Sequence, residues 1–192
     1  MTTEEEKELI NKAQKDPEAF GIIFDNYYTP IFNYCLRRVS HKTSAEDLTS
    51  EIFFKALNAL PKFRWQNVPF SAWLYRIASN EVISFYRKNS QTVSSLEDMQ
   101  EKFGFDLAGE GNSATNLLEG ELTKEQQDQF LLVKQCLERL PEHYKEVLSL
   151  RYFEKLSIIE VAQILDKPEG TIKSLLSRGA DLLREQFNLQ PL

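Results

Sequence analysis

The sequence predicts an all-α protein in which two helical domains are joined by an acidic, flexible linker. Apolar residues recur at helical spacing on both sides of the middle of the chain, and no segment shows the clean alternation of a β-strand. The middle, residues 91–125, has eight acidic and two basic residues and no sustained period, which is typical of a linker. We therefore expect one domain at residues 1–90, a linker at 91–125 and a second domain, containing a helix-turn-helix, at 126–192.

The first domain is expected to contain four helices. A short helix comes first, and Asp16 with Pro17 then provides a capping carboxylate and a proline at the first helical position of a long aromatic segment. Pro30 predicts a kink or a division of that segment, because it lacks the N–H of a helical hydrogen bond. A third helix is predicted to begin at Ser44 and to end before the next proline, and a fourth covers residues 70–87.

A helix-turn-helix is predicted in residues 140–185. Its first helix ends in the segment 166–170, because Pro168 has no N–H to donate and disfavours helix at the residue before it. One side of the next helix is apolar, and the other carries hydroxyl groups and long cations, which bind phosphates and base edges in the major groove. These candidate DNA-binding residues are Thr171, Lys173, Ser174, Ser177 and Arg178. A plain helical hairpin is the other interpretation of the pattern.

The third predicted helix has a second face that a buried core does not explain. Its apolar residues, Leu57 among them, make one broad buried side, whereas Asp47, Glu51, Phe54 and Asn58 recur at helical spacing on the far side. An outward phenylalanine set among carboxylates is a common composition of a docking surface. The alternative is a solvated acidic stripe with one stray aromatic side chain.

Cations and aromatic side chains are interleaved between the third and fourth predicted helices. Aromatic rings stack on unpaired bases, cations hold the phosphate backbone, and Asn makes a two-point hydrogen bond to a base. We expect Trp73 in the core and Trp65 at the surface, and Phe63 fits either place. The candidates for binding single-stranded DNA are Lys62, Phe63, Arg64 and Trp65 in a loop and Arg76, Asn80 and Arg87 on the fourth helix.

The composition excludes several other classes of function. No glycine-rich phosphate loop, nucleophile with its base, or carboxylate pair with an acid–base partner appears, so we expect no catalytic residue, no cofactor and no enzyme activity. Cys35 and Cys136 lie far apart in apolar helical patterns and predict buried thiols without a metal site. No apolar run is long enough to span a membrane and the acidic start is unlike a signal peptide, so we expect a cytoplasmic protein.

Two blocks of the sequence together resemble bacterial extracytoplasmic-function sigma factors. Residues 45–53, AEDLTSEIF, resemble the A-E-D-L-T-Q-E-x-F signature of sigma region 2, and residues 70–80, FSAWLYRIASN, resemble its F-x-x-W-L-x-R-I-A-x-N run. Residues 140–142, LPE, resemble the opening of sigma region 4, and residues 170–174, GTIKS, resemble the G-T-V-K-S of its recognition helix. The order and spacing of the blocks also agree with that family.

The resemblance implies a dissociable subunit of RNA polymerase that selects promoters, with core RNA polymerase, promoter DNA and an anti-sigma factor as partners. It places the −10 element at the loop and fourth-helix candidates and the −35 element at the helix-turn-helix candidates. A sigma factor needs little DNA affinity of its own, which agrees with a net charge of −6 and two domains that are not strongly basic. The implied polymerase-docking residues are Asp47, Ser50, Glu51, Phe54 and Asn58.

The sequence also departs from the family. The departures are Ser50 for Gln, Ser79 for Arg, Ser84 for Asp, Asp166 for the common turn Gly, Leu175 for Arg and Gly179-Ala180 for Ala-Arg. Aspartate adopts the left-handed backbone of such a turn more readily than most residues. The recognition helix is less basic than is typical, which keeps the second of two alternatives open. One is a stand-alone helix-turn-helix regulator that binds operators as a dimer, and the other is a sigma-like antagonist that sequesters polymerase or an anti-sigma factor.

Overall fold

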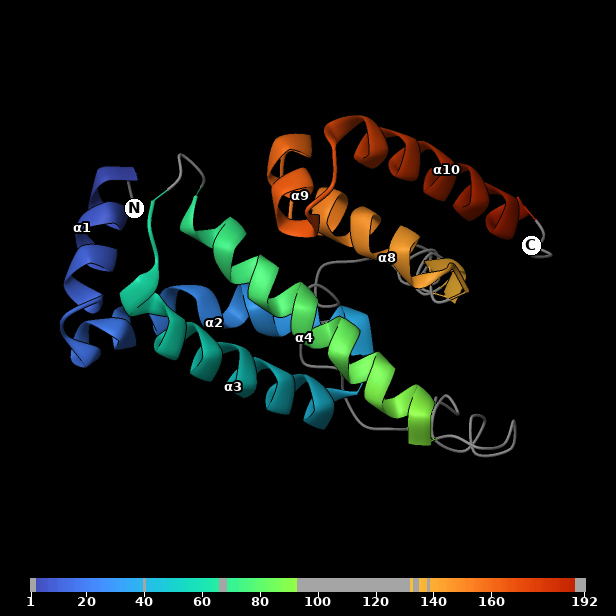
Figure 1. The fold of residues 1–192 in the computed structure, drawn as a ribbon. Coiled ribbons are helices and arrows are strands. Elements are labelled where there is room, and N and C mark those ends of the chain that lie inside the picture. The colour runs from blue at the N-terminus through green and yellow to red at the C-terminus, as the bar shows by residue number, and fades with distance from the viewer. Residues whose placement is uncertain are drawn as a thin grey trace, which may run out of the picture.

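The structure, a computed structural model, describes residues 3–39, 41–65, 69–92, 132, 135–137 and 139–188. Every element in these residues is helical, which confirms the all-α class (Figure 1). The first unit contains α1 (Thr3–Ala13), α2 (Pro17–Val39), α3 (Lys42–Ala59), the 3₁₀ turn η1 (Leu60–Lys62) and α4 (Phe70–Thr92). The second contains α8 (Glu142–Leu148), the π-helical turn η2 (Ser149–Phe153), α9 (Ile158–Leu165) and α10 (Glu169–Asn188). From position 93 onward, the predicted linker lies outside the described residues.

α2 begins as the sequence predicts and continues through its internal proline. The Asp16 carboxylate accepts a hydrogen bond from the Glu18 N–H at 3.0 Å. Of the two alternatives predicted at Pro30, a kink or a division, the division is wrong, because α2 is one helix from residue 17 to residue 39. Ile23 and Ile31, on either side of the proline, are each 1% exposed, so burial along the whole helix offsets the ~3 kcal/mol cost of an internal proline.

α3 begins two residues earlier than predicted. It starts at Lys42 rather than at Ser44, and the capping position belongs to His41, whose side chain makes no capping hydrogen bond. The Ala45 N–H donates to the His41 carbonyl at 3.0 Å, and Ala45 is fully buried. Packing of this first turn, rather than a side-chain cap, therefore sets the start of α3.

The core of the first unit lies between α2, α3 and α4. Ile52, Phe70 and Leu74 are among its fully buried side chains. The prediction that Leu57 belongs to the buried side of α3 is wrong, because 38% of its surface is exposed. The buried stripe follows Ile52 and Ala56 along the helix, and Leu57 lies beyond its edge.

The helix-turn-helix is formed by α9 and α10. The Ser157 hydroxyl accepts a hydrogen bond from the Glu160 N–H at 3.2 Å, and the Glu160 carboxylate accepts one from the Ser157 N–H at 2.7 Å, a capping box that opens α9. α9 ends at Asp166, whose φ of 52° lies in the left-handed region, as expected of the residue that replaces the turn glycine. The Lys167 N–H then donates to the Ala162 carbonyl at 2.9 Å.

Gly179 accounts for one of the departures from the family pattern. α10 packs on α8, and a Cβ atom at Gly179 would lie 3.2 Å from Leu148 Cδ1 and 3.3 Å from Tyr144 Cδ1. Both distances are shorter than an optimal carbon–carbon contact. The glycine therefore lets α10 approach α8 closely beside the Tyr144 ring.

Gly179→Val is expected to lower the free energy of unfolding of the second unit. Overpacking costs about 1–3 kcal/mol, and only up to ~1 kcal/mol returns from replacing a helical glycine. Urea denaturation followed by circular dichroism measures the loss. Gly170→Val on the same helix is the matched control, because, apart from its chain neighbours and its own helix backbone, no described atom lies within 4 Å of its Cβ position. Equal stability of the two variants would contradict the close approach.

The two units contact each other. α4 packs against α9, and in Figure 1 α8 and α9 lie on one side of α4 with α10 beyond them. Arg38 of α2 also forms ion pairs with Glu142 and Glu146 of α8. The helix-turn-helix is therefore held against the first unit, and the sites of the two units have to be considered together.

Candidate functional site

All of the residues predicted to dock core polymerase lie on the exposed side of α3. Phe54 is 62% exposed, although it is a large apolar side chain. Ser50 Oγ and Asn58 Nδ2 each donate to the carbonyl four residues earlier, at 2.9 Å, so these two side chains are held against their own helix. Phe54 and the carboxylates of Asp47 and Glu51 are left as the groups that a partner can contact.

Lys55 connects this surface of α3 to α4. Its ammonium group lies 3.3 Å from a Glu51 oxygen and 2.6 Å from a Glu81 oxygen of α4. The hydrogen bond to Glu81 raises the pKa of Lys55, so the side chain stays cationic and links α3 to α4. Sequence reasoning missed Lys55, although its spacing of four residues from Glu51 is that of a helical ion pair.

Four of the seven residues predicted to bind the −10 element line one cleft of about 530 Å³. They are Lys62, Phe63, Arg64 and Arg76. Pro69, Ala72 and Trp73 of the first unit also line this cleft, and the second unit contributes Gln163, Ile164 and Asp166. The cleft therefore lies where the first unit meets the turn of the helix-turn-helix, and sequence reasoning missed the contribution of α9.

The other three predicted residues do not line this cleft. Asn80 and Arg87 are exposed further along α4. Trp65 is less exposed than expected, because its side chain is half-buried, as are those of Phe63 and Trp73. Lys7 of α1 lies over the Trp65 ring, with its Nζ atom 5.4 Å from the ring centroid. The first helix therefore covers a side chain that sequence spacing alone places in a solvated loop.

The loop that carries these residues is anchored by aromatic rings. The centroid of the Phe63 ring lies 5.5 Å from that of Phe70 and 5.0 Å from that of Trp73. Gln14 Nε2 donates to the Leu60 carbonyl at 3.1 Å and to the Phe63 carbonyl at 2.8 Å. Phe63 is therefore an anchor whose ring also lines the cleft, and Gln14 is a positioning residue that no sequence pattern marked.

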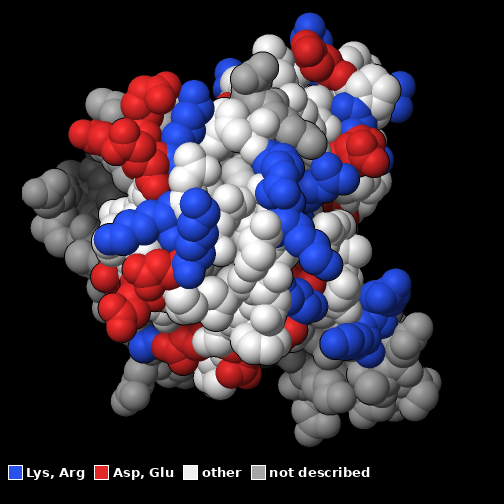
Figure 2. Space-filling model, turned by 60° about the vertical axis from the view of Figure 1, so that its left-hand side comes forward, with Lys and Arg blue, Asp and Glu red and all other residues white. Residues whose placement is uncertain are grey.

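The first unit contributes three exposed cations to the cleft, and the second unit contributes the exposed carboxylate of Asp166. Lys62, Arg64 and Arg76 are all exposed, whereas Phe63 and Trp73, which also line the cleft, are each half-buried. Figure 2 turns the α1 side of the molecule forward and shows Lys and Arg side chains on both sides of an uncharged strip, with acidic side chains toward the edges. An anionic backbone and an unpaired base together require cations beside an aromatic surface, and the cleft has both.

The predicted −35 residues all lie on the exposed side of α10. They are Thr171, Lys173, Ser174, Ser177 and Arg178. The opposite side of the helix is buried and contains Ile172, Leu176 and Gly179. Lys173 Nζ lies 4.0 Å from a Glu169 oxygen, but this exposed pair holds the lysine only weakly. The hydroxyls and cations of α10 are thus available to a duplex.

The two cysteines of the chain are both buried. Cys35 and Cys136 are buried free thiols, as predicted, and burial raises the pKa of Cys35 to about 12, so that thiol stays protonated. Among the described residues, no three His, Cys, Asp or Glu side chains come together as metal ligands. No helix in the described part of the chain is both long enough and apolar enough to cross a bilayer.

Comparison with known proteins identifies the two units. Residues 23–92 match the family model of Sigma-70 region 2, and residues 130–183 match that of Sigma-70, region 4. The fold and the two matches define a sigma factor of the sigma-70 class, a non-enzymatic factor of transcription initiation. The ECF RNA polymerase sigma factor SigW of Bacillus subtilis (strain 168) is 32% identical over 182 residues, covering 94% of this chain and 96% of the relative. The chain belongs to the extracytoplasmic-function (ECF) sigma factors.

Two solved structures share the fold. CnrH, in complex with the cytosolic domain of CnrY, matches with a TM-score of 0.67 at 19% identity, covering 97% of this chain and 99% of that chain. The sigma factor RpoE of Bartonella quintana, in complex with the anti-sigma factor NepR, matches with a TM-score of 0.64 at 22% identity, covering 90% of this chain and 98% of that chain. At these identities the comparison supports the fold of both units.

Proposed function

We propose that this chain binds core RNA polymerase and directs promoter-specific transcription initiation. In this proposal residues 1–90 dock on polymerase and capture the −10 element, residues 126–192 read the −35 element, and residues 91–125 connect them. The proposal rests mainly on the cleft that Phe63 lines together with the cations of Lys62, Arg64 and Arg76. Membership of the ECF sigma factors supports the same role.

The cleft contains the groups that capture of an unpaired base requires. Taking a base out of a duplex costs a few kcal/mol of stacking and pairing. Stacking a base on an aromatic side chain returns about 1–3 kcal/mol, and Phe63 and Trp73 both line the cleft. Cations at the rim neutralise backbone phosphates. We therefore assign promoter opening to this cleft, with the same strand continuing past Trp65, Asn80 and Arg87.

The outward face of α3 suits docking on a protein. Burial of an exposed phenylalanine gives an interface its apolar centre, and carboxylates beside it select a basic partner surface. We assign this face to core polymerase, because a stand-alone helix-turn-helix regulator leaves it without a role. The docking residues in the proposal are Asp47, Ser50, Glu51, Phe54 and Asn58.

We also propose an anti-sigma factor as the regulatory partner. The RpoE structure is that of a sigma factor bound to the anti-sigma factor NepR, and this chain shares its fold. We also propose a cytoplasmic location, because core polymerase and promoter DNA are the proposed partners.

In-vitro transcription from a random-promoter library tests the proposed function. Bacterial core polymerase is supplied with and without this protein, and the transcripts are sequenced. Enrichment of a two-part promoter motif only in the presence of the protein is the expected result. Absence of enrichment, despite demonstrated binding to core polymerase, would contradict promoter selection.

A sigma-like antagonist is the second candidate function. The observation that favours it is the reduced basicity of α10, in which Leu175 and Ala180 stand where the family has arginine. An antagonist occupies polymerase through the α3 face without directing initiation. It would inhibit transcription that a second, unrelated sigma factor directs, and it would enrich no motif of its own in the library.

Arg178→Ala is expected to weaken binding of the −35 element by about 1–3 kcal/mol, if the arginine contacts a base. Its guanidinium group is exposed on the side of α10 that also carries Thr171 and Ser174. Electrophoretic mobility shifts of holoenzyme on a promoter from the library measure the change. Arg184→Ala is the matched control, because Arg184 pairs with Asp181 at 2.9 Å near the end of the helix. Equal losses of promoter affinity in both variants would contradict a base contact by Arg178.

A further inference from the structure

One isoleucine is exposed on α4 in a row of polar and cationic residues. Between positions 70 and 88, the exposed residues of α4 are Arg76, Asn80, Ile83, Arg87 and Lys88. Ile83 is the apolar member of this set, and 54% of its surface is exposed. The assignment of the −10 element to α4 gives a role to the cations and to the amide, but it gives none to Ile83.

Helical spacing places Ile83 inside the row that is proposed to follow the DNA strand. This row lies on one face of the helix, because its members are separated by four, three and four residues: Arg76, Asn80, Ile83 and Arg87. The rise of an α-helix places Asn80 and Ile83 about 4.5 Å apart along its axis, and stacked bases are about 3.4 Å apart. A base beside Ile83 is therefore a near neighbour of the base beside Asn80.

The exposed side of α4 suits a polyanion, although the chain as a whole is acidic. The exposed residues between positions 70 and 88 include three cations and no carboxylate. Glu81 is the acidic residue of this stretch; it is half-buried, and its carboxylate lies 2.6 Å from Lys55 Nζ of α3. An apolar side chain among cations and an amide matches a nucleic-acid strand, whereas the carboxylates around Phe54 on α3 match a basic protein surface.

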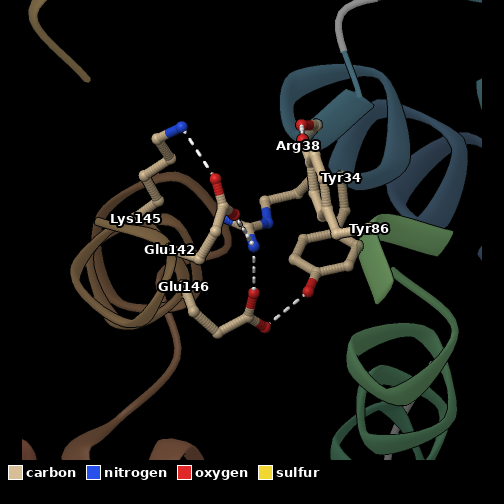
Figure 3. A network of polar contacts seen from close by, with 6 residues as sticks. All are labelled: Tyr34, Arg38, Tyr86, Glu142, Lys145 and Glu146. Atoms are coloured by element: carbon tan, nitrogen blue, oxygen red, sulfur yellow. Dashed lines mark hydrogen bonds and ion pairs between the residues drawn. The ribbon is translucent and has the colours of Figure 1, made fainter. Parts of the chain in front are cut away.

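Contacts on both sides of Ile83 in the sequence hold this part of α4 in place. Two residues before it, Glu81 pairs with Lys55 of α3. Three residues after it, the Tyr86 hydroxyl donates a hydrogen bond to the Arg38 carbonyl of α2 (Figure 3). A β-branched side chain in a helix also has one strongly preferred rotamer. A ligand can therefore contact the methyl groups of Ile83 with little loss of conformational entropy.

A methyl group is the feature of DNA that an exposed isoleucine can recognise. Arginine and asparagine form hydrogen bonds with phosphates and base edges, which the side chain of Ile83 cannot do. Among the four bases of DNA, thymine alone carries a methyl group, at C5. Contact between Ile83 and that methyl group removes apolar surface of both from water, which is favourable. Ile83 is therefore suited to distinguish thymine from the other three bases at one position.

We propose that Ile83 is a specificity-determining residue that contacts the C5 methyl group of one thymine in the promoter DNA along α4. This inference rests on the proposed −10 function of the first unit. It adds that one position of the −10 region is read through a methyl contact and not through a hydrogen bond. Removal of the methyl group from that thymine and removal of the Ile83 side chain then weaken binding through the same contact, so the two losses do not add.

Uracil replacement in the promoter tests the contact, because uracil is thymine without the C5 methyl group. A promoter from the library is synthesised with uracil in place of each thymine of its −10 region in turn, first in one strand and then in the other. Electrophoretic mobility shifts of holoenzyme measure the affinity for each DNA and identify the strand that Ile83 contacts. Loss of one methyl contact is expected to weaken binding about fourfold at one position.

Ile83→Ala removes the side chain that makes the contact. Alanine favours helix and Ile83 is exposed, so the helical content by circular dichroism is expected to stay unchanged. Holoenzyme with this variant is expected to bind the unmodified promoter about fourfold more weakly and to lose the effect of uracil at that one position. Ile83→Val keeps the branched methyl groups and is expected to keep most of the effect. Ile22→Ala on α2 is the matched control, because Ile22 is 50% exposed.

The outcomes separate the methyl contact from the −10 function. An unchanged effect of uracil in Ile83→Ala would overturn the contact, and so would a promoter at which uracil weakens binding at no position. Loss of the uracil effect in Ile22→Ala as well would also overturn it, because the effect would then not depend on α4. In each of these cases holoenzyme still selects promoters, and the proposed function stands. A holoenzyme that enriches no motif from the library would contradict the proposed function, and the contact with it.

Discussion

Asp47→Arg combined with Glu51→Arg is expected to abolish binding of the chain to core RNA polymerase without unfolding it. Both carboxylates are exposed on α3, one on each side of Ser50. Reversing them places like charges against a basic partner surface, which costs several kcal/mol. Lys55 keeps its contact with Glu81 at 2.6 Å, so the link between α3 and α4 survives. Titration of labelled protein with core polymerase, followed by fluorescence anisotropy, measures the loss.

Glu4→Arg combined with Glu8→Arg on α1 is the matched control. These acidic residues are also exposed and four residues apart on a helix, so the net charge changes by the same amount. The control is expected to bind polymerase like the unchanged chain. Unchanged promoter-dependent transcription by the α3 variant would remove the docking assignment. An equal loss of polymerase binding in both variants would show that the overall charge, and not the α3 face, causes the loss.

Helical periodicity is sufficient to predict the fold class, because burial requires apolar side chains at the spacing seen in α2, α3 and α4. The ends of the helices are harder to predict, because tertiary packing decides them. Burial of Ala45 starts α3 before Ser44, and burial on both sides of Pro30 keeps α2 continuous. The left-handed turn at Asp166 has a local cause and was predictable. The capping box that Ser157 opens has an equally local signature, which the sequence analysis missed.

The candidate sites, too, could be predicted only in part from the sequence. Spacing along one helix predicts which residues share a face, so the exposed rows of α3 and α10 follow from sequence. Spacing does not predict which elements meet. Gln14 holds a loop 49 positions away, and Arg38 pairs with Glu142 at a separation of 104 positions. No local pattern marks such pairs, because they exist only after both units have packed.

Phe70→Ala is expected to lower the free energy of unfolding by about 3–5 kcal/mol, the largest effect on stability among these predictions. Phe70 is fully buried, and its ring centroid lies 5.1 Å from that of Trp73 and 5.6 Å from that of Tyr27. Truncation leaves a cavity below the loop that Phe63 anchors, so contacts on several sides are lost together. Urea denaturation followed by tryptophan fluorescence measures the loss, because both tryptophans of the chain lie around Phe63.

Phe54→Ala makes the same chemical change on the exposed face of α3 and is the matched control. Because 62% of Phe54 is exposed, the free energy of unfolding is expected to change by no more than ~0.5 kcal/mol. Polymerase binding by this variant is expected to weaken, since Phe54 is the apolar centre of the proposed docking face. Phe70 thus contributes to the fold and Phe54 to the interface. A large loss of stability in Phe54→Ala with unchanged polymerase binding would show that the face belongs to the core instead.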